Sequence, residues 1–192
     1  MPIPYLNGLP WTTWSREERL FCAVLYEHAR RCPGEFAAWL IESTGLNIPS
    51  AGDWDLGFEV CLYRDFLWQQ PGLTAKGSGL SAKRTFDLCL FGETSIIIIE
   101  AKVCGGFTTE QLENIGKDVA QIRRLPGMQD LNVLLVALAS ARYLANARKR
   151  TRDTFKGWLS WQQLFEHFPE PLFEQADKMY AGKRGELLGR TA

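Results

Sequence analysis

The chain has 192 residues, of which 46% are hydrophobic and 12% aromatic, and its 22 basic side chains are balanced by 22 acidic ones. This length suits one domain with a single core, and the apolar fraction excludes a disordered chain. A net charge of zero excludes a strongly basic protein surface, so any polyanionic partner must be bound by a local patch.

No segment of the sequence predicts a membrane span. The strongest apolar run, residues 95–99, has the length of a strand and falls far short of the roughly 18 residues that a spanning helix needs. The first residues show no basic segment followed by an apolar one, so no signal peptide is expected and a cytoplasmic location is predicted. The five cysteines share no C-x-x-C spacing, which favours buried free thiols over a zinc site or disulfides.

A pair of helices is expected over about residues 15–45. The letters S-R-E-E at the start of this segment have the spacing of a capping box, in which the Ser15 hydroxyl accepts from the Glu18 amide and Glu18 reaches back. Apolar residues at helical spacing then predict helices over residues 15–31 and 35–44.

The remainder of the chain predicts strands and helices in alternation. Strands are expected over residues 56–68, 85–91, 95–103, 132–139 and 155–159, helices over 109–125 and 160–168, and a mobile loop over 69–83. Four consecutive isoleucines, Ile96–Ile99, are apolar on both faces and place their strand inside a covered sheet. We therefore predict a single α/β domain, residues 1–192, with a mixed central β-sheet flanked by helices.

Three charged residues are expected to converge at the end of the hairpin formed by the second and third strands. If Glu93 and Thr94 form a two-residue loop, counting outward from that turn places Asp87 directly opposite Glu100. Their Cβ atoms would then be about 4.5–5.5 Å apart on one face of the sheet. Lys102 lies two residues beyond Glu100 and is expected to project from the same face.

This arrangement predicts a bound divalent cation. Facing carboxylates repel each other, and burial increases the cost. Mg²⁺ typically uses one or two carboxylates together with waters and phosphates, so an ion shared by Asp87 and Glu100 would remove the repulsion. The Lys102 ammonium would neutralise one acid or lie beside a metal-bound water, which is a nucleophile suited to phosphodiester hydrolysis. The alternative is an ion-pair triplet with no catalytic role.

These residues resemble the signature of the PD-(D/E)xK nuclease superfamily. Phe86-Asp87, twelve intervening residues and Glu100-Ala101-Lys102 are similar to that motif, with Phe86 in place of its proline. The predicted order of elements over about residues 15–140 also resembles the αβββαβ core of the restriction-endonuclease-like fold. The resemblance implies that Asp87 and Glu100 bind Mg²⁺ or Mn²⁺ and that Lys102 activates or orients water.

The resemblance also implies residues outside the motif. Gln111 is similar to a glutamine that many members carry on the following helix, although a solvated helix residue is the alternative. Some members have a metal-binding acid on the first helix, and Glu18, or else Glu17, resembles it. Glu59 in the first strand is a competing third acid.

One basic segment is the candidate for phosphate contacts. It lies between the fourth and fifth predicted strands, and its central cations are Arg148, Lys149, Arg150 and Arg152. We expect these four to bind a nucleic-acid backbone, with a solvated face as the alternative.

Together the motif and its context predict a metal-dependent nuclease that uses Mg²⁺ or Mn²⁺ to hydrolyse phosphodiester bonds of nucleic acid. Only the resemblance favours DNA over RNA. A homodimer or a partner protein would supply specificity, since the chain shows little beyond the core, and no membrane partner is expected. The alternative is a nuclease-fold module that binds nucleic acid or protein without cleaving it.

Overall fold

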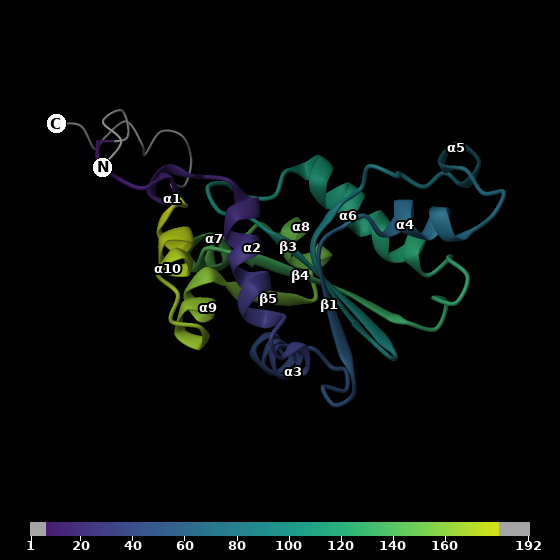
Figure 1. The fold of residues 1–192 in the computed structure, drawn as a ribbon, viewed down its shortest axis with the longest axis horizontal. Coiled ribbons are helices and arrows are strands. Elements are labelled where there is room, and N and C mark those ends of the chain that lie inside the picture. Colours follow the sequence, from purple (N-terminus) through teal and green to yellow (C-terminus); the bar gives the residue numbers. More distant parts are fainter. Residues whose placement is uncertain (1–6, 181–192) are drawn as a thin grey trace.

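The computed structural model describes residues 7–180, in which one five-stranded mixed β-sheet forms the centre of an α/β fold (Figure 1). The strands are β1 (Trp54–Val60), β2 (Phe86–Gly92), β3 (Ser95–Ala101), β4 (Asn132–Ala139) and β5 (Gly157–Ser160). They lie side by side in chain order, with β1, β2 and β3 antiparallel and β3, β4 and β5 parallel. The predicted α/β class with a mixed central sheet is confirmed. Residues 1–6 and 181–192 of the predicted single domain lie outside the described part.

Helices cover both faces of this sheet (Figure 1). In chain order they are α1 (Trp11–Trp14), α2 (Glu18–Ala29), α3 (Pro33–Thr44), α4 (Leu62–Gln69), α5 (Ala75–Ser78), α6 (Thr109–Ile122), α7 (Ala141–Ala145), α8 (Lys149–Thr154), α9 (Trp161–His167) and α10 (Pro171–Lys178). The core on one face is closed by α2, α3, α9 and α10, and the core on the other face by α4 and α6. The short helix α8 contacts α6.

The isoleucine run in β3 contributes to both cores. Ile97 and Ile99 pack among the residues of α2 and α3, whereas Ile96 and Ile98 pack on the side of α6. All four side chains are buried. Because successive side chains of a strand point to opposite faces, only an interior strand covered on both sides can bury such a run. This prediction is confirmed.

The first predicted strand is too long, which is a correction. β1 ends at Val60, and residues 62–69 form α4 instead. Glu59, one residue before this end, has a left-handed backbone conformation with φ of 52°, which interrupts the regular strand geometry. Leu62 and Tyr63 are buried on the first turn of α4, while Trp68 on its outer side is 86% exposed. Apolar residues at this density fit both strand and helix patterns, so periodicity did not separate them.

The predicted capping box at the start of α2 is also wrong. The helix begins at Glu18, and its N-cap residue makes no side-chain capping bond. The Ser15 hydroxyl instead accepts from the backbone N–H of Glu17 at 3.3 Å. Glu18 does not bond back to the Ser15 backbone, because its carboxylate accepts a hydrogen bond from Lys102, which is 84 residues further along the chain.

Two further expectations concern thiols and membranes. All five cysteines are free, with Cys22 and Cys89 buried. Among residues 7–180, none of the helices is both long and apolar enough to cross a bilayer.

Candidate functional site

The β2–β3 hairpin positions the site. Its register agrees with the prediction, since Leu88 lies opposite Ile99 and the three pairs between them and the turn have the same register. The ladder ends at that pair. Beyond it, a carboxylate oxygen of Asp87 accepts the backbone N–H of Ala101 at 2.8 Å. Asp87 therefore takes the place of a backbone partner at the point where the two strands separate, one position beyond the last paired residues.

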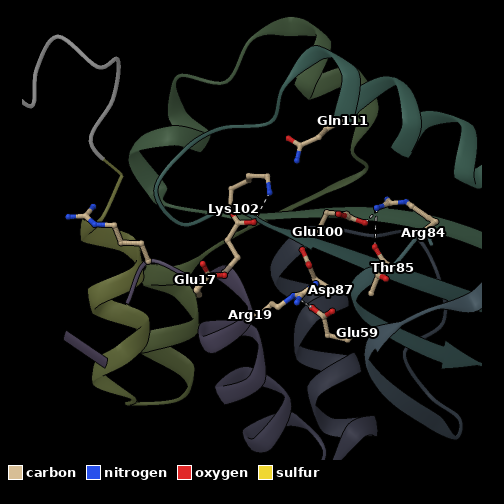
Figure 2. Close-up of a pocket in the computed structure, with 11 residues that line it drawn as sticks. Glu17, Arg19, Glu59, Arg84, Thr85, Asp87, Glu100, Lys102 and Gln111 are labelled. Carbon is tan, nitrogen blue, oxygen red and sulfur yellow. Dashed lines mark hydrogen bonds and ion pairs between the residues drawn. The ribbon is translucent and has the colours of Figure 1, made fainter. Parts of the chain in front are cut away.

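A pocket of about 530 Å³ opens at this end of the sheet (Figure 2). Seven residues that the sequence singled out line it: Glu17, Glu18, Glu59, Asp87, Glu100, Lys102 and Gln111. They come from the start of α2, the end of β1, the β2–β3 hairpin with the residue that follows β3, and the first turn of α6. The structure thus brings together the predicted catalytic group and all three candidates for a third acid.

Sequence reasoning missed four residues of this pocket, Arg16, Arg19, Arg84 and Thr85, of which Arg84 makes the most contacts with the site. Its Nη2 lies 2.7 Å from Glu100 Oε1, and its Nε lies 2.9 Å from Asp118 Oδ2 on α6. The other oxygen of Asp118 accepts from the Tyr63 hydroxyl at 2.8 Å. Arg84 also lies over the ring of Phe86, 4.5 Å from its centroid. Glu100 is therefore anchored through Arg84 to α6 and α4.

One signal in the sequence could have indicated this network. Ile115, Asp118 and Ile122 share the buried side of α6, so an acid stands in the apolar stripe of that helix. A buried carboxylate needs a cation or several hydrogen bonds, because burial without a partner is costly. The pattern indicates that some cation must reach Asp118, but nothing in it identifies Arg84.

Burial controls the electrostatics of the two hairpin acids. The pKa of Glu100 is raised to about 8, chiefly by burial and also by the nearby Asp87, against the opposing effects of Arg84 and Lys102. Burial likewise raises the pKa of Asp87, while the Ala101 N–H and Lys102 lower it and the acids Glu18 and Glu59 raise it. The pocket concentrates poorly solvated carboxyl groups, and a cation would stabilise their ionised form.

Lys102 is held from three directions. Its Nζ lies 2.7 Å from Glu18 Oε2 and 5.5 Å from the centroid of the Phe107 ring. Its backbone carbonyl accepts from the indole N–H of the buried Trp161 at 2.9 Å. The lysine that follows β3 is thus fixed to α2 by its side chain and to α9 by its backbone.

Two other predicted residues have structural contacts of their own. The side-chain oxygen of Gln111 accepts from the Thr108 N–H, and the Thr108 hydroxyl accepts from the Gln111 N–H, which forms a capping box at the start of α6. Because that oxygen is engaged, Gln111 can offer the pocket only the N–H donors of its amide. Glu59 lies 3.3 Å from Arg19 Nε on α2.

The donor set fits a hard divalent cation. Asp87 and Glu100 each use one carboxylate oxygen in the contacts above, which leaves Asp87 Oδ1 and Glu100 Oε2 as oxygen donors. Within residues 7–180, no cluster of three acidic, histidine or cysteine side chains has the arrangement of a metal cage. The protein would therefore supply two carboxylates, and water or substrate would complete the shell, which is the usual pattern for Mg²⁺.

The predicted basic segment lies away from this pocket's lining. Lys149 forms an ion pair with Asp153, and Arg150 forms one with Glu113 of α6. Arg152 donates to two backbone carbonyls of the segment before α8. Together with Arg148, these are the four predicted phosphate contacts, and none of them lines the pocket. Their role in binding nucleic acid stays a prediction.

Comparisons with known proteins add no family. No protein-family model matches the chain, and a search of curated proteins finds no significant match. The molecule is shown to be an α/β protein with a five-stranded mixed sheet and flanking helices.

Proposed function

We propose that this protein is a metal-dependent nuclease that hydrolyses phosphodiester bonds of nucleic acid, with DNA preferred over RNA. The observation that carries the proposal is the convergence of Asp87, Glu100 and Lys102 where β2 and β3 separate, inside one pocket. The order α2, β1, β2, β3, α6, β4 supports a relation to the αβββαβ core of PD-(D/E)xK nucleases, with α3 inserted before β1 and α4 and α5 after it.

In this proposal Asp87 and Glu100 hold a Mg²⁺ or Mn²⁺ ion through the two carboxylate oxygens that the surrounding hydrogen bonds leave open. The ion, when bound, polarises the scissile phosphate and lowers the pKa of water. The chain's own contribution is to orient its ligands. The Ala101 N–H fixes Asp87, and Arg84 fixes Glu100, so each carboxylate keeps one oxygen for the ion.

Lys102 positions water and balances charge that develops on the phosphate oxygens. Its ammonium has three donor protons, and Glu18 accepts one of them at 2.7 Å. This contact gives Glu18 a role in orienting the lysine. Gln111 donates from its amide to the water or phosphate, since its oxygen is engaged in the capping box.

Cleavage assays test this proposal. Circular single-stranded DNA, supercoiled plasmid and a structured RNA are incubated with the protein and Mg²⁺ or Mn²⁺, beside an EDTA control. Glu100→Gln and Lys102→Ala should each lose at least about 100-fold in rate, the usual effect of removing a preorganised catalytic group. Glu110→Gln, an exposed acid in the first turn of α6, is the matched control and should keep the activity.

A non-cleaving binding module is the second candidate, and one observation favours it. Glu100 is already paired with Arg84, and Lys102 with Glu18, so the charges compensate one another within the protein. In that case no substrate is cut, and Mn²⁺ does not raise the melting temperature. Cleavage that disappears in Glu100→Gln would exclude this candidate.

A further inference from the structure

Three hollows lie in series along α6, and the second and third are also lined by the segment that connects α4 to β2. The first is the pocket with Asp87 and Glu100, and a second of about 400 Å³ adjoins it across Arg84, which lines both. A third, of about 380 Å³, shares Gly79 and Gln121 with the second. Successive hollows that share walls suit a linear polymer better than a single small molecule.

The second hollow carries positive charge that the protein leaves available. Lys83 lines it from the segment before β2, and Lys117 lines it from α6. Both side chains are exposed, and in the described part of the chain neither ammonium forms an ion pair or a hydrogen bond. The acid in this lining, Asp118, is buried and is engaged by Arg84 and Tyr63. An anion entering here would meet two free lysines.

The third hollow differs in character. Phe66, Leu73 and Leu80 give it an apolar lining, and Arg124 adds one cation at its edge. Apolar walls next to a cationic hollow match the alternation of bases and phosphates along a strand of nucleic acid. In a duplex the bases are paired and stacked, so only an unpaired stretch could place a base in such a hollow.

The cations at α8 are engaged differently. Lys149, Arg150 and Arg152 are each held by a carboxylate or carbonyl of the same chain. Binding a phosphate there would require breaking these contacts, whereas Lys83 and Lys117 have no such contacts to break. Among the described residues, Arg148 is the one of the four predicted phosphate contacts whose side chain has no such partner, but it lines neither hollow. Lys83 and Lys117 are therefore the pair of available cations that lies next to the carboxylate pocket.

We propose that the second hollow binds the phosphates of a single-stranded stretch of nucleic acid and that the third receives its bases. The inference rests on the proposed function, because the strand would extend from the phosphodiester bond held at Asp87 and Glu100. Lys83 and Lys117 are then the phosphate contacts of the flanking nucleotides.

Binding in EDTA tests this without any cleavage. Anisotropy of a labelled 12-nucleotide single strand and of the matching duplex is measured at several salt concentrations. Lys83→Ala/Lys117→Ala should weaken single-strand binding about tenfold or more and reduce the slope of log K against log salt by roughly 1.4, which is about 0.7 for each lost phosphate contact. Arg31 lies between α2 and α3, and Lys178 ends α10; these helices cover the other face of the sheet. Arg31→Ala/Lys178→Ala removes equal charge and should leave both the affinity and the slope unchanged.

Several results would overturn the subsite. They are no binding by the wild type at low salt, an unchanged slope in Lys83→Ala/Lys117→Ala, a larger loss in Lys149→Ala/Arg150→Ala, or tighter binding of the duplex. The two proposals fail separately. If cleavage depends on Glu100 but binding does not depend on Lys83 and Lys117, only the subsite proposal is wrong. If binding depends on these lysines but no metal-dependent cleavage occurs, only the nuclease proposal is wrong.

Discussion

The guanidinium of Arg84 lies 2.7 Å from the carboxylate of Glu100, and this contact joins the end of β3 to the buried acid of α6. The side chains of the pair are only 22% and 10% exposed. An acid that lines the pocket is thereby held by one of its oxygens, and the other oxygen forms no hydrogen bond within the described residues. This pair therefore stabilises the fold and, in the proposed mechanism, also orients a metal ligand.

Loss of Arg84 is expected to be costly. Arg84→Ala leaves Glu100 and Asp118 without their shared cation, and breaking a buried pair by removing one partner typically costs about 3–5 kcal/mol. Because the guanidinium is partly exposed, we expect the lower end of that range. Urea unfolding at pH 8 measures it. Arg64→Ala removes an exposed pair with Asp65 and should change the free energy of unfolding far less. Equal effects in the two variants would contradict the buried network.

Stability should fall as pH rises because of Glu100. Its pKa is about 8 in the folded protein, against about 4.3 for an unfolded glutamate. Between these values the folded state binds a proton that the unfolded state has released, so the free energy of unfolding decreases with increasing pH. The raised pKa of Asp87 acts in the same direction.

Thermal melts from pH 5 to 8.5 measure this dependence. Each kcal/mol lost should lower the melting temperature by about 2–4 °C for a chain of this length. Glu100→Gln cannot ionise and should flatten the profile, whereas Glu110→Gln should leave it as in the wild type. A wild-type profile that rises across this window and an unchanged profile in Glu100→Gln would both count against the assignment.

The hairpin register was predictable from the sequence because a two-residue turn fixes which residues face each other. The isoleucine run likewise identified an interior strand, since no other location buries both of its faces. Asp87, Glu100 and Lys102 could therefore be placed together from local rules alone. Their common pocket follows from that register and from the separation of the strands beyond Leu88.

Contacts between distant segments were not predictable in this way. The letters at the start of α2 fit a capping box, but Glu18 binds Lys102, which lies 84 residues away and outcompetes the local partner. Arg84 and Asp118 are 34 residues apart, and their pairing depends on how α6 packs against the sheet. The left-handed backbone of Glu59, one residue before the end of β1, also has no signature in residue type.

Glu18 can be tested as a positioning residue. Because its carboxylate holds the Lys102 ammonium, Glu18→Gln should lower kcat by about tenfold and leave the metal concentration for half-maximal activity unchanged. A metal ligand would behave differently, since its loss would raise that concentration. Glu17→Gln, which removes a neighbouring acid with no contact to Lys102, is the control. A shift in metal requirement for Glu18→Gln would contradict the positioning role.

Two substitutions of Gln111 distinguish its role in helix capping from a role in the pocket. Gln111→Ala removes the capping box of α6 and should cost about 1 kcal/mol in urea unfolding, as should Thr108→Ala. Gln111→Glu keeps a capping acceptor but replaces an N–H donor in the pocket with negative charge. We expect its stability to stay near wild type while cleavage falls. Full activity in Gln111→Glu would show that capping is the whole role of this residue.

The most direct test of the central claim is calorimetric titration of Mn²⁺ into the metal-free protein, because it requires no knowledge of the substrate. The account predicts one ion bound per chain, with binding lost in Asp87→Asn and in Glu100→Gln and kept in Glu110→Gln. No binding by the wild type, or binding that survives both of the first two substitutions, would contradict a metal centre on the β2–β3 hairpin.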